Sequence, residues 1–547
     1  MSASLTPRDH RGAAADLVLV GANVRTLDRA RPGAGAVAVR GDVILAVGEA
    51  ADVRDWRGPH TEVVDLGGAT LTPGLVDAHL HPVSGLEMAV GADLSACRDL
   101  DQLRTVLAHT AARTPPGGWV RGWGLDPNVF GDRHVTTDLV EDALGGAPAY
   151  LLMFDVHSAL ASRRALELAG VAGPRRFADR SKVVCDAYCR PTGHLLEMAA
   201  MSLVERVIPA EPLQARRDRL RRLLSDMAAT GLTGGHVMDC QGDSLDLLTA
   251  LEDGDDLPLR LRIAPFCLPG ADRDELEHLV RLQRRRGRDW QVGAVKFMID
   301  GTVDGGTAWL EEPDTHGESA HSLWLDPADY TAAVHHLARA GVPTVTHAIG
   351  DAGVRHTLDT LGALPPGSPR LLHRVEHIET LAPDQVPRFA ALGVIASMQP
   401  THCTDYTRAD HGDNWSQRLG DQRADRGWAC RDLRESGATL ALGSDWPVAP
   451  YDPRAVLAAA RLRRPAGAPD AVPNQPAQAL TPLMAIEGYT THAARAAGEE
   501  SRSGRIVPGH RADLTAFAVD PLTAPPDELA QADIGLTVSG GRITHRA

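Results

Sequence analysis

The sequence predicts an α/β protein whose main domain is a (β/α)8 barrel, and three observations support this fold class. Strand-like apolar runs alternate with helix-like segments through the middle of the 547-residue chain, which is typical of parallel βα units. Eight such runs can be distinguished, and eight parallel strands form a (β/α)8 barrel. β-branched runs bounded by Gly and Asp lie near both chain ends, which indicates a smaller antiparallel sheet.

Both ends of the chain are assigned to one small domain. Residues 1–15 are expected to form a flexible tail. Residues 16–71 contain short strand-like runs separated by turns, and residues 496–547 have the same character. The simplest arrangement joins these two segments in one β-sandwich domain, and two unrelated β caps are the alternative. Residues 72–495 are then left for the barrel domain.

The barrel strands are expected at 74–79, Leu232–Met238, Leu261–Phe266, Ala294–Ile299, Pro343–His347, Arg374–Ile378, Val394–Met398 and Thr439–Gly443. The connection between the first two, residues 82–230, is too long for a single crossover, so it is expected to be an insertion with structure of its own. Because loops that follow barrel strands lie on the catalytic face, this insertion is expected to wall the substrate pocket.

The first barrel strand ends in two histidines, His79 and His81, one residue apart. Alternate residues of an extended strand point to the same face, so both imidazoles project together. Two neutral imidazoles that converge on one point suit a divalent metal such as zinc. The chain contains 23 histidines, so this pair is weak evidence until further ligands are found downstream.

Other strand ends supply those ligands. Each has an ordinary explanation when taken alone: a packed histidine, a helix-capping aspartate, or a lysine paired with a buried acid. Residues at the carboxyl ends of successive barrel strands, however, point into one mouth. The sequence therefore predicts a metal centre built from His79, His81, Lys296, His347, His377 and Asp445.

Composition limits the possible partners and cell compartments. A formal net charge of −15 argues against a nucleic-acid partner. The seven cysteines are scattered and form no Cys-x-x-Cys pair, so neither a disulfide framework nor a zinc ribbon is expected, and a reducing cytoplasm fits. The N-terminus has no apolar signal core and no apolar run could span a bilayer, so no membrane partner is expected.

The strand-end residues and their neighbours resemble the amidohydrolase superfamily of metal-dependent hydrolases. The stretch at 73–81, Pro-Gly-Leu-Val-Asp-Ala-His-Leu-His, matches the opening motif of that superfamily. A narrower resemblance, to the amidohydrolase 3 family that includes N-substituted formamide deformylase, runs in order along nearly the whole chain from residue 16. It rests on Val295-Lys296-Phe297 with Asp300-Gly301, His347-Ala348-Ile349-Gly350-Asp351, Glu376-His377, Gln399-Pro400-Thr401-His402 and Gly443-Ser444-Asp445-Trp446-Pro447.

The resemblance implies roles for the candidate ligands. His79 and His81 are expected to hold one Zn2+ ion and His347 and His377 a second, with Lys296 between them as an N6-carboxylysine. Carbamoylation fits the chemistry, because it turns a cationic amine into an anionic group that can bind metal. A mononuclear centre with a free Lys296 is the alternative. The resemblance also suggests a homodimer.

The insertion departs from the family pattern. Where the family usually reads Asp-Gly-His-Ser, this chain has Asp155-Val156-His157-Ser158, and Ala161-Ser162 replaces a frequent Asn-Ser pair. These changes lie in the segment expected to face substrate, so the substrate of a relative cannot be copied. Asp155 is a candidate pocket residue. Five tryptophans, several of them near strand ends, are candidates for an apolar pocket lining, with structural packing as the alternative: Trp123, Trp309, Trp324, Trp415 and Trp446. Of these, Trp123, Trp309 and Trp446 are assigned to the pocket.

The predicted reaction is metal-assisted hydrolysis of a non-peptide C–N bond in an amide, N-formyl amine or N-acyl amine. Asp445 is expected to act as general base and then general acid, with His157 and His402 as candidate donors to the developing oxyanion. Deamination of a ring amidine at a mononuclear site is the alternative within enzymes. A catalytically inactive scaffold is a third possibility, which the complete ligand set disfavours.

Overall fold

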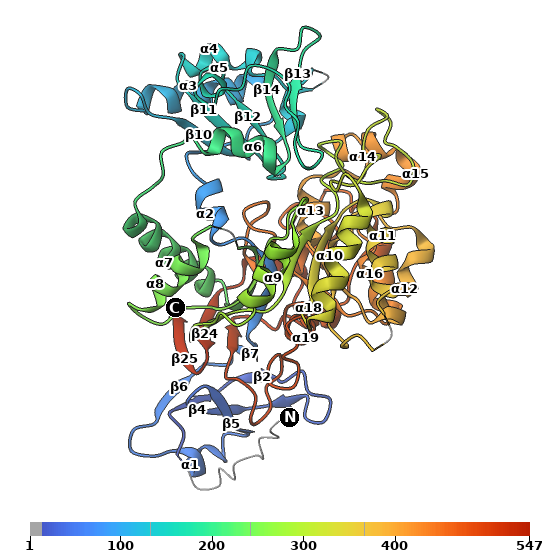
Figure 1. Ribbon diagram of the computed structural model, residues 1–547. Helices are drawn as coiled ribbons and strands as arrows, with labels where there is room; N and C mark the ends of the chain where they lie inside the picture. Colours follow the sequence, from blue (N-terminus) through green and yellow to red (C-terminus); the bar gives the residue numbers. More distant parts are fainter. Residues whose placement is uncertain (1–13, 132, 241, 366) are drawn as a thin grey trace.

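The computed structural model describes residues 14–131, 133–240, 242–365 and 367–547. Residues 1–13 of the tail that was expected over residues 1–15 lie outside the described residues. The chain is an α/β protein, as predicted (Figure 1). Every segment expected to be a barrel strand is a strand: β8 (Leu75–Leu80), β15 (Leu232–Cys240), β16 (Arg260–Pro265), β18 (Val295–Met298), β19 (Thr344–Ala348), β20 (Arg374–His377), β21 (Ile395–Met398) and β22 (Leu440–Leu442).

These strands follow one another in space in chain order. Strands β8, β15 and β16 pair in parallel, with the short β17 (Trp290–Val292) beside β16, and strands β18 to β22 form a second parallel sheet. A bridge between Phe266 and Lys296 joins the two sheets at one side. At the other side, the N–H of Asp445, just beyond β22, donates to the carbonyl of His79 at 2.7 Å. This is the strand order that a (β/α)8 barrel requires.

The approach of β22 to β8 depends on small and polar residues. A Cβ atom on Gly443 would lie 2.5 Å from the backbone nitrogen of His79, so only glycine fits there. The buried carboxylate of Asp77 accepts hydrogen bonds from the N–H groups of His79 (3.0 Å) and Ser444 (3.1 Å). Burial raises the pKa of Asp77 to about 7. Together these contacts place Asp445 beside the histidines of β8.

The eight strands β8, β15, β16 and β18 to β22 are called the strand array below. Helices cover its outside and pack on one large hydrophobic core. In the helix over Pro327–Arg339, the Asp326 side chain accepts from the N–H of Ala328 and Pro327 occupies the first turn, which are both typical start signals. The helices between β15 and β23 (Leu514–Phe517) are α8 (Ser244–Glu252), α9 (Arg273–Leu282), α10 (Pro327–Arg339), α11 (Asp351–Gly362), α12 (Val386–Leu392), α13 (Pro400–Asp405), α14 (Asn414–Leu419), α15 (Asp421–Ala424), α16 (Cys430–Glu435), α17 (Pro453–Leu462), α18 (Pro482–Tyr489) and α19 (Thr491–Ala496).

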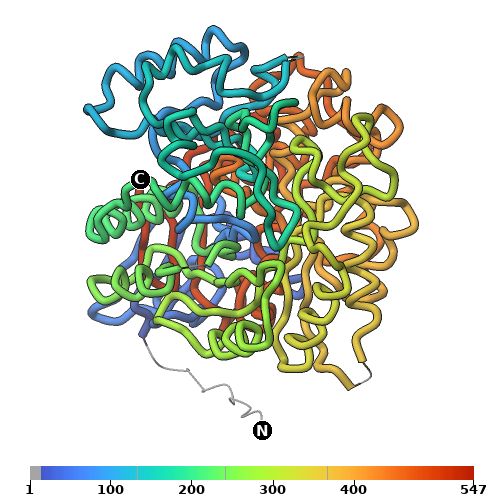
Figure 2. The backbone as a smooth tube through the Cα atoms, turned by 45° about the horizontal axis from the view of Figure 1, so that its top comes forward, coloured from blue at the N-terminus to red at the C-terminus, as the bar shows by residue number. Residues whose placement is uncertain are grey.

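The segment after β8 has structure of its own, and its sheet with helices α3 to α6 lies at the top of Figure 1. The same part lies at the top of the tube in Figure 2. Its sheet has the order β13–β14–β12–β11–β10–β9. One face packs on α3 and the other on α6, so the sheet has two apolar cores. The elements are α2 (Ser84–Met88), β9 (Ala92–Asp93), α3 (Leu100–Arg113), β10 (Val120–Leu125), α4 (Glu141–Leu144), β11 (Ala149–Met153), β12 (Ser158–Ala161), α5 (Arg163–Leu168), β13 (Lys182–Cys185), β14 (Pro191–Leu196), α6 (Met198–Glu205) and α7 (Leu213–Ala229).

The two chain ends meet in two sheets at the bottom of Figure 1. One sheet contains β5 (Val43–Gly48), β4 (Ala36–Arg40), β1 (Leu17–Val20) and β6 (Glu62–Asp65). The other contains β25 (Arg542–Arg546), β24 (Ile534–Ser539), β23 (Leu514–Phe517), β7 (Thr70–Pro73), β2 (Asn23–Arg25) and β3 (Gly33–Ala34). Strands β7 and β23 pair antiparallel, and one core takes side chains from both ends. The short helices α1 (Val53–Trp56) and α20 (Pro526–Gln531) complete these segments.

A buried ion-pair cluster ties the C-terminal segment to the strand array. The Glu499 carboxylate, 6% exposed, accepts from Arg262 of β16 at 3.1 Å and from Arg511 at 3.2 Å. Burial opposes ionisation, but the two arginines outweigh it and lower the pKa of Glu499 from 4.5 to about 2. A pKa that is lower in the folded state stabilises the fold above pH 4.5, and this stabilisation is lost as the pH falls towards about 2.

We expect Glu499→Gln to lower the free energy of unfolding by about 3 kcal/mol at neutral pH, because it leaves two buried guanidinium groups without their anion. Chemical denaturation measured between neutral pH and acid should show the difference shrinking below pH 4.5. The neighbouring Glu500→Gln is the matched control and should have little effect. Equal destabilisation by both variants would contradict this assignment.

Candidate metal centre

His79 is held in the tautomer that a metal ligand needs. Its Nδ1 donates to Glu376 Oε2 at 2.6 Å, and Arg374 donates to Glu376 Oε1 at 2.9 Å. The lone pair of His79 Nε2 is therefore free, and this atom lies 3.5 Å from Lys296 Nζ and 3.4 Å from Asp445 Oδ1. Burial and the nearby Lys296 hold the pKa of His79 well below its usual value. His79 is thus neutral and ready to bind a cation.

His81 lies between two carboxylates. Its Nε2 is 2.8 Å from Asp445 Oδ1, and its Nδ1 is 3.6 Å from Asp239 Oδ2. Burial disfavours the imidazolium, but Asp239 and Asp445 outweigh burial and raise the pKa of His81 to about 9. The ligand atoms of His79, His81 and Asp445 lie within 4.8 Å of one another, so one ion can take the place of the His81 proton.

A second donor group shares Asp445. His377 Nδ1 and His402 Nε2 each lie 3.8 Å from Asp445 Oδ2, and neither nitrogen has a hydrogen-bond partner among the described residues, although both are buried. Burial disfavours the carboxylate form of Asp445, but His79 and His81 outweigh it, so its pKa lies well below the usual range. Orphaned imidazole nitrogens around a buried anion are the donor set that a divalent cation such as zinc fits.

The backbone at two of these residues is strained. His377 and Asp445 adopt φ angles of 71° and 61°, a left-handed conformation that residues other than glycine rarely adopt. Each costs about 1–3 kcal/mol, and surrounding contacts must hold it in place. The hydrogen bond from the Asp445 N–H to His79 is one such contact. Strain of this kind gathers at functional sites, where it directs side chains towards one point.

Lys296 and His347 complete the predicted set. Lys296 is 2% exposed, and burial lowers its pKa from 10.5 to about 8, so a fraction of neutral amine exists at neutral pH. Nε2 of His347 donates to the Gly301 carbonyl at 3.1 Å, which leaves Nδ1 as the free acceptor. The His347 ring centroid lies 4.4 Å from that of His377. All six predicted ligands therefore converge, while the tightest second group contains His402 in place of His347.

A buried aspartate explains why the motifs around Lys296 and His347 occur together. Asp300 accepts from the N–H groups of Ile349 (3.0 Å) and Gly350 (2.8 Å), so it ties the loop after β18 to the end of β19. Burial raises the pKa of Asp300 to about 7. A Cβ on Gly350 would lie 2.1 Å from the Trp309 carbonyl, so this position requires glycine.

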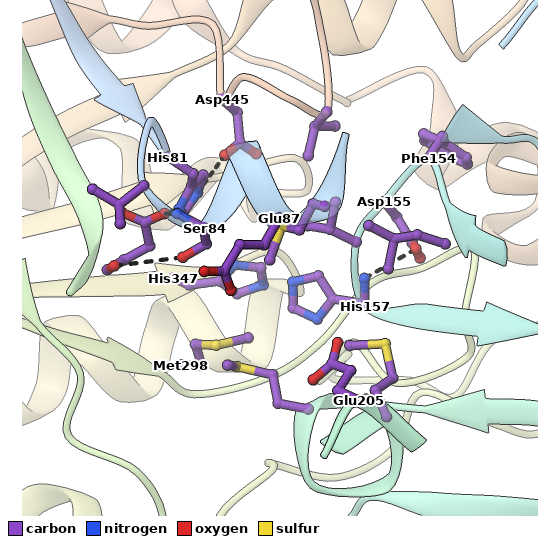
Figure 3. Close-up of a pocket in the computed structure, with 18 of the residues that line it drawn as sticks. His81, Ser84, Glu87, Phe154, Asp155, His157, Glu205, Met298, His347 and Asp445 are labelled. Carbon is purple, nitrogen blue, oxygen red and sulfur yellow. Dashed lines mark hydrogen bonds and ion pairs between the residues drawn. The ribbon is translucent and has the colours of Figure 1, made fainter. Parts of the chain in front are cut away.

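The donors open into a cavity of about 630 Å3 between the strand array and the insertion (Figure 3). Asp155, His157 and His402 line it. The three tryptophans assigned to the pocket from the sequence do not border this cavity. Trp123 packs on the insertion core, Trp309 lies against His356, and Trp446 lies over Gly85 and beside Tyr451. Trp415, which was also a candidate, and Trp428 line it instead.

His157 is presented by the insertion. Its Nδ1 donates to Glu197 Oε2 at 2.9 Å, and its ring centroid lies 4.8 Å from that of His347 (Figure 3). Burial disfavours its charged form, but Glu197 outweighs burial and raises the pKa of His157. The neighbouring Val156 adopts a φ of 53°, a conformation that glycine reaches without strain.

Several carboxylates of the site carried no predicted role. Glu376 and Glu197 orient His79 and His157, and Glu376 lies within a motif quoted from the sequence. Asp304 and Glu379 also line the cavity, and no sequence signal distinguishes them. The sequence does carry a signal for Asp239, because this residue lies at the carboxyl end of β15, the second strand of the array. Its carboxylate is buried, accepts from the Ser84 N–H at 2.9 Å and has one oxygen without a partner.

We expect Asp239→Asn to weaken Zn2+ binding by about 10- to 100-fold, because His81 loses the anion that orients its ring. Competition with a zinc chelator measures this affinity without any assay of turnover. Asp246→Asn is the control, since Asp246 is a nearby but exposed aspartate. An Asp239→Asn protein that binds Zn2+ as tightly as wild type would remove Asp239 from the centre.

Comparison with known proteins gives concordant matches. The sequence pattern of the amidohydrolase family matches residues 62–545. The putative amidohydrolase YtcJ of Bacillus subtilis (strain 168) is 27% identical over 519 residues, which cover 93% of this chain and 96% of that protein. The N-substituted formamide deformylase of Arthrobacter pascens is 26% identical over 543 residues, which cover 97% and 98%.

A solved structure shares the fold. The crystal structure of an uncharacterized metal-dependent hydrolase from Pyrococcus horikoshii OT3 superimposes with a TM-score of 0.71 at 22% identity. The alignment covers 93% of this chain and 99% of that one. At this identity, the likeness concerns the fold alone.

Proposed function

The chain belongs to the amidohydrolase family of metal-dependent hydrolases, and we propose that it cleaves a non-peptide C–N bond in an amide, such as an N-formyl or N-acyl amine. The observation that carries this proposal is the convergence of His79, His81 and Asp445, with Lys296 beside them, at one end of a large cavity. The name of the Arthrobacter pascens relative supports an amide as the substrate class.

We assign one or two Zn2+ ions to this centre and take the strand array to be a (β/α)8 barrel. His79, His81 and Asp445 would hold one ion, and His347 and His377 would hold a second, with Lys296 contributing as an N6-carboxylysine. When bound, such an ion lowers the pKa of the attacking water and polarises the substrate carbonyl.

The side chains of the chain do the proton transfer. Asp445 is anionic, so it accepts the proton of the attacking water and then delivers it to the leaving nitrogen. His157 and His402 both have raised pKa values, owing to Glu197 and Glu379 respectively, so each can donate to the developing oxyanion. The insertion supplies His157 and restricts access of water to the site.

A hydrolysis screen on the zinc-loaded protein tests this proposal. N-formyl amines, N-acyl amines and cyclic amides are offered beside ring amidines, and the products are identified. Release of an amine and a carboxylate supports amide hydrolysis. Ammonia released only from ring amidines would instead support the mononuclear deaminase. A folded, metal-loaded protein that turns over none of these would support an inactive scaffold.

The cellular setting belongs to the same proposal. All seven cysteines are free thiols, and none of the helices in the described ranges has the length and apolar character needed to cross a bilayer. We propose a cytoplasmic homodimer that acts on a small molecule and binds no nucleic acid. Light scattering of the purified protein tests the assembly state.

A further inference from the structure

Three arginines line the cavity away from the metal centre: Arg121, Arg216 and Arg219. Two of them are paired. Arg216 contacts Glu87 at 2.8 Å and Asp243 at 2.7 Å, and Arg219 contacts Glu211 at 2.6 Å. Arg121 forms no ion pair with any carboxylate of the described residues; its one hydrogen bond runs from Nη2 to the Glu87 carbonyl at 2.8 Å. Its guanidinium is thus the unpaired one of the three.

The insertion sheet positions Arg121. Arg121 of β10 and Tyr150 of β11 are in-register partners on neighbouring parallel strands, so their side chains point to the same face. The guanidinium carbon lies 5.8 Å from the centre of the Tyr150 ring, and Arg121 Nε is buried without a hydrogen-bond partner. Burial lowers the pKa of Arg121, and the nearby Tyr150, Glu205 and Glu87 offset this effect only in part. A desolvated guanidinium with unused donors favours an anionic partner.

The acids around Arg121 are already engaged. The Glu87 carboxylate pairs with Arg216, and the Glu205 carboxylate accepts from the Tyr150 hydroxyl at 2.8 Å. Burial raises the pKa of Glu205. An anion at Arg121 meets the one arginine of the cavity wall that has no ion-pair partner among the described residues.

The wall of the same cavity also carries four methionines: Met88, Met198, Met201 and Met298. Thioether side chains are flexible and polarisable, so they adapt to apolar groups of varied shape. The cavity thus combines a hydrolytic centre, an apolar wall and an unpaired guanidinium. We propose that Arg121 binds a carboxylate of the substrate, so that the substrate class is an amide whose apolar body ends in a carboxylate. This inference rests on the proposed function.

Matched substrate pairs test the inference. One series contains N-acetyl ω-amino acids of increasing chain length, and the other contains N-butyl monoamides of dicarboxylic acids; each acid is compared with its neutral carboxamide. At the best chain length we expect wild type to prefer the acid by about 10- to 100-fold in kcat/KM, the size of a charge-assisted hydrogen bond. Arg121→Gln should remove this preference, chiefly through a higher KM for the acids.

Two controls accompany this variant. Arg163→Gln changes an exposed arginine of the same insertion and should keep the preference. Arg121→Lys retains the positive charge and should keep part of the preference for acids. This variant keeps the test valid if Arg121→Gln fails to fold. The inference would be overturned if wild type had the same kcat/KM for acids and carboxamides. It would also be overturned if the preference for acids survived in Arg121→Gln.

A binding experiment separates this inference from the proposed reaction. Calorimetry on zinc-loaded Asp445→Asn protein measures the affinity for each acid and carboxamide without turnover. If wild type hydrolyses no amide, yet the acids bind more tightly and lose this advantage in Arg121→Gln, the proposed reaction is wrong and the anion site stands. If amides are hydrolysed with no dependence on a carboxylate, the reaction stands and the anion site is wrong.

Discussion

Asp445→Asn is expected to lower kcat by about 1,000- to 10,000-fold while the protein keeps its fold and most of its metal. Asn has the same shape and retains one oxygen ligand, but it cannot accept the proton of the attacking water. The pKa of Asp445 lies well below its usual range, so wild type holds the anion that this step needs throughout the neutral range. Steady-state kinetics on an amide found in the screen, together with metal analysis, measures both effects.

The control for this variant is Asp470→Asn, which changes an exposed aspartate outside the cavity and should leave kcat unchanged. Metal content separates two causes of low activity. Loss of turnover with metal retained supports a role in proton transfer, whereas parallel loss of metal and turnover supports a role as ligand only. Turnover close to that of wild type would defeat the assignment of Asp445 as the base.

The residues predicted as metal ligands lie close together because they sit at regular positions of regular elements. A His-x-His pair at a strand end fixes the direction of both rings, and parallel strands bring their carboxyl ends to one side. The structure accordingly brings Lys296, His347, His377 and Asp445 together with that pair. Even the close approach of β22 to β8 has a sequence signal in Gly443, which no larger residue can replace.

The pocket was harder to predict because nearness to a strand end does not fix where a side chain points. Trp309 and Trp446 follow β18 and β22 as expected, but their rings pack away from the cavity. Trp415 lines the cavity from α14, and its ring nitrogen donates to Glu379 at 2.8 Å. Such contacts join residues far apart in the chain, and no periodicity records them. The same holds for Arg121, whose importance depends on which neighbouring arginines are already paired.

Removal of the Lys296 amine by Lys296→Met is expected to lower kcat by about 1,000-fold and to reduce the zinc content. The methionine side chain keeps a similar length but can neither take up CO2 nor bridge two ions. Lys182→Met changes an exposed lysine and is the matched control. Metal analysis and intact mass, which reports the mass added by one CO2 in wild type, measure the effect independently of turnover.

The chemistry of Lys296 also predicts dependence on bicarbonate. The neutral amine attacks CO2, a C–N bond forms, and one proton leaves, so the step requires a deprotonated lysine. With a pKa of about 8, roughly a tenth of Lys296 is neutral at neutral pH, far more than for an exposed lysine. Metal-free protein prepared without CO2 should therefore regain activity when zinc and bicarbonate are added together, and only partly with zinc alone. A Lys296→Met protein with full zinc content and activity would instead indicate that Lys296 of wild type is a free amine beside a mononuclear centre, which would favour the deaminase alternative.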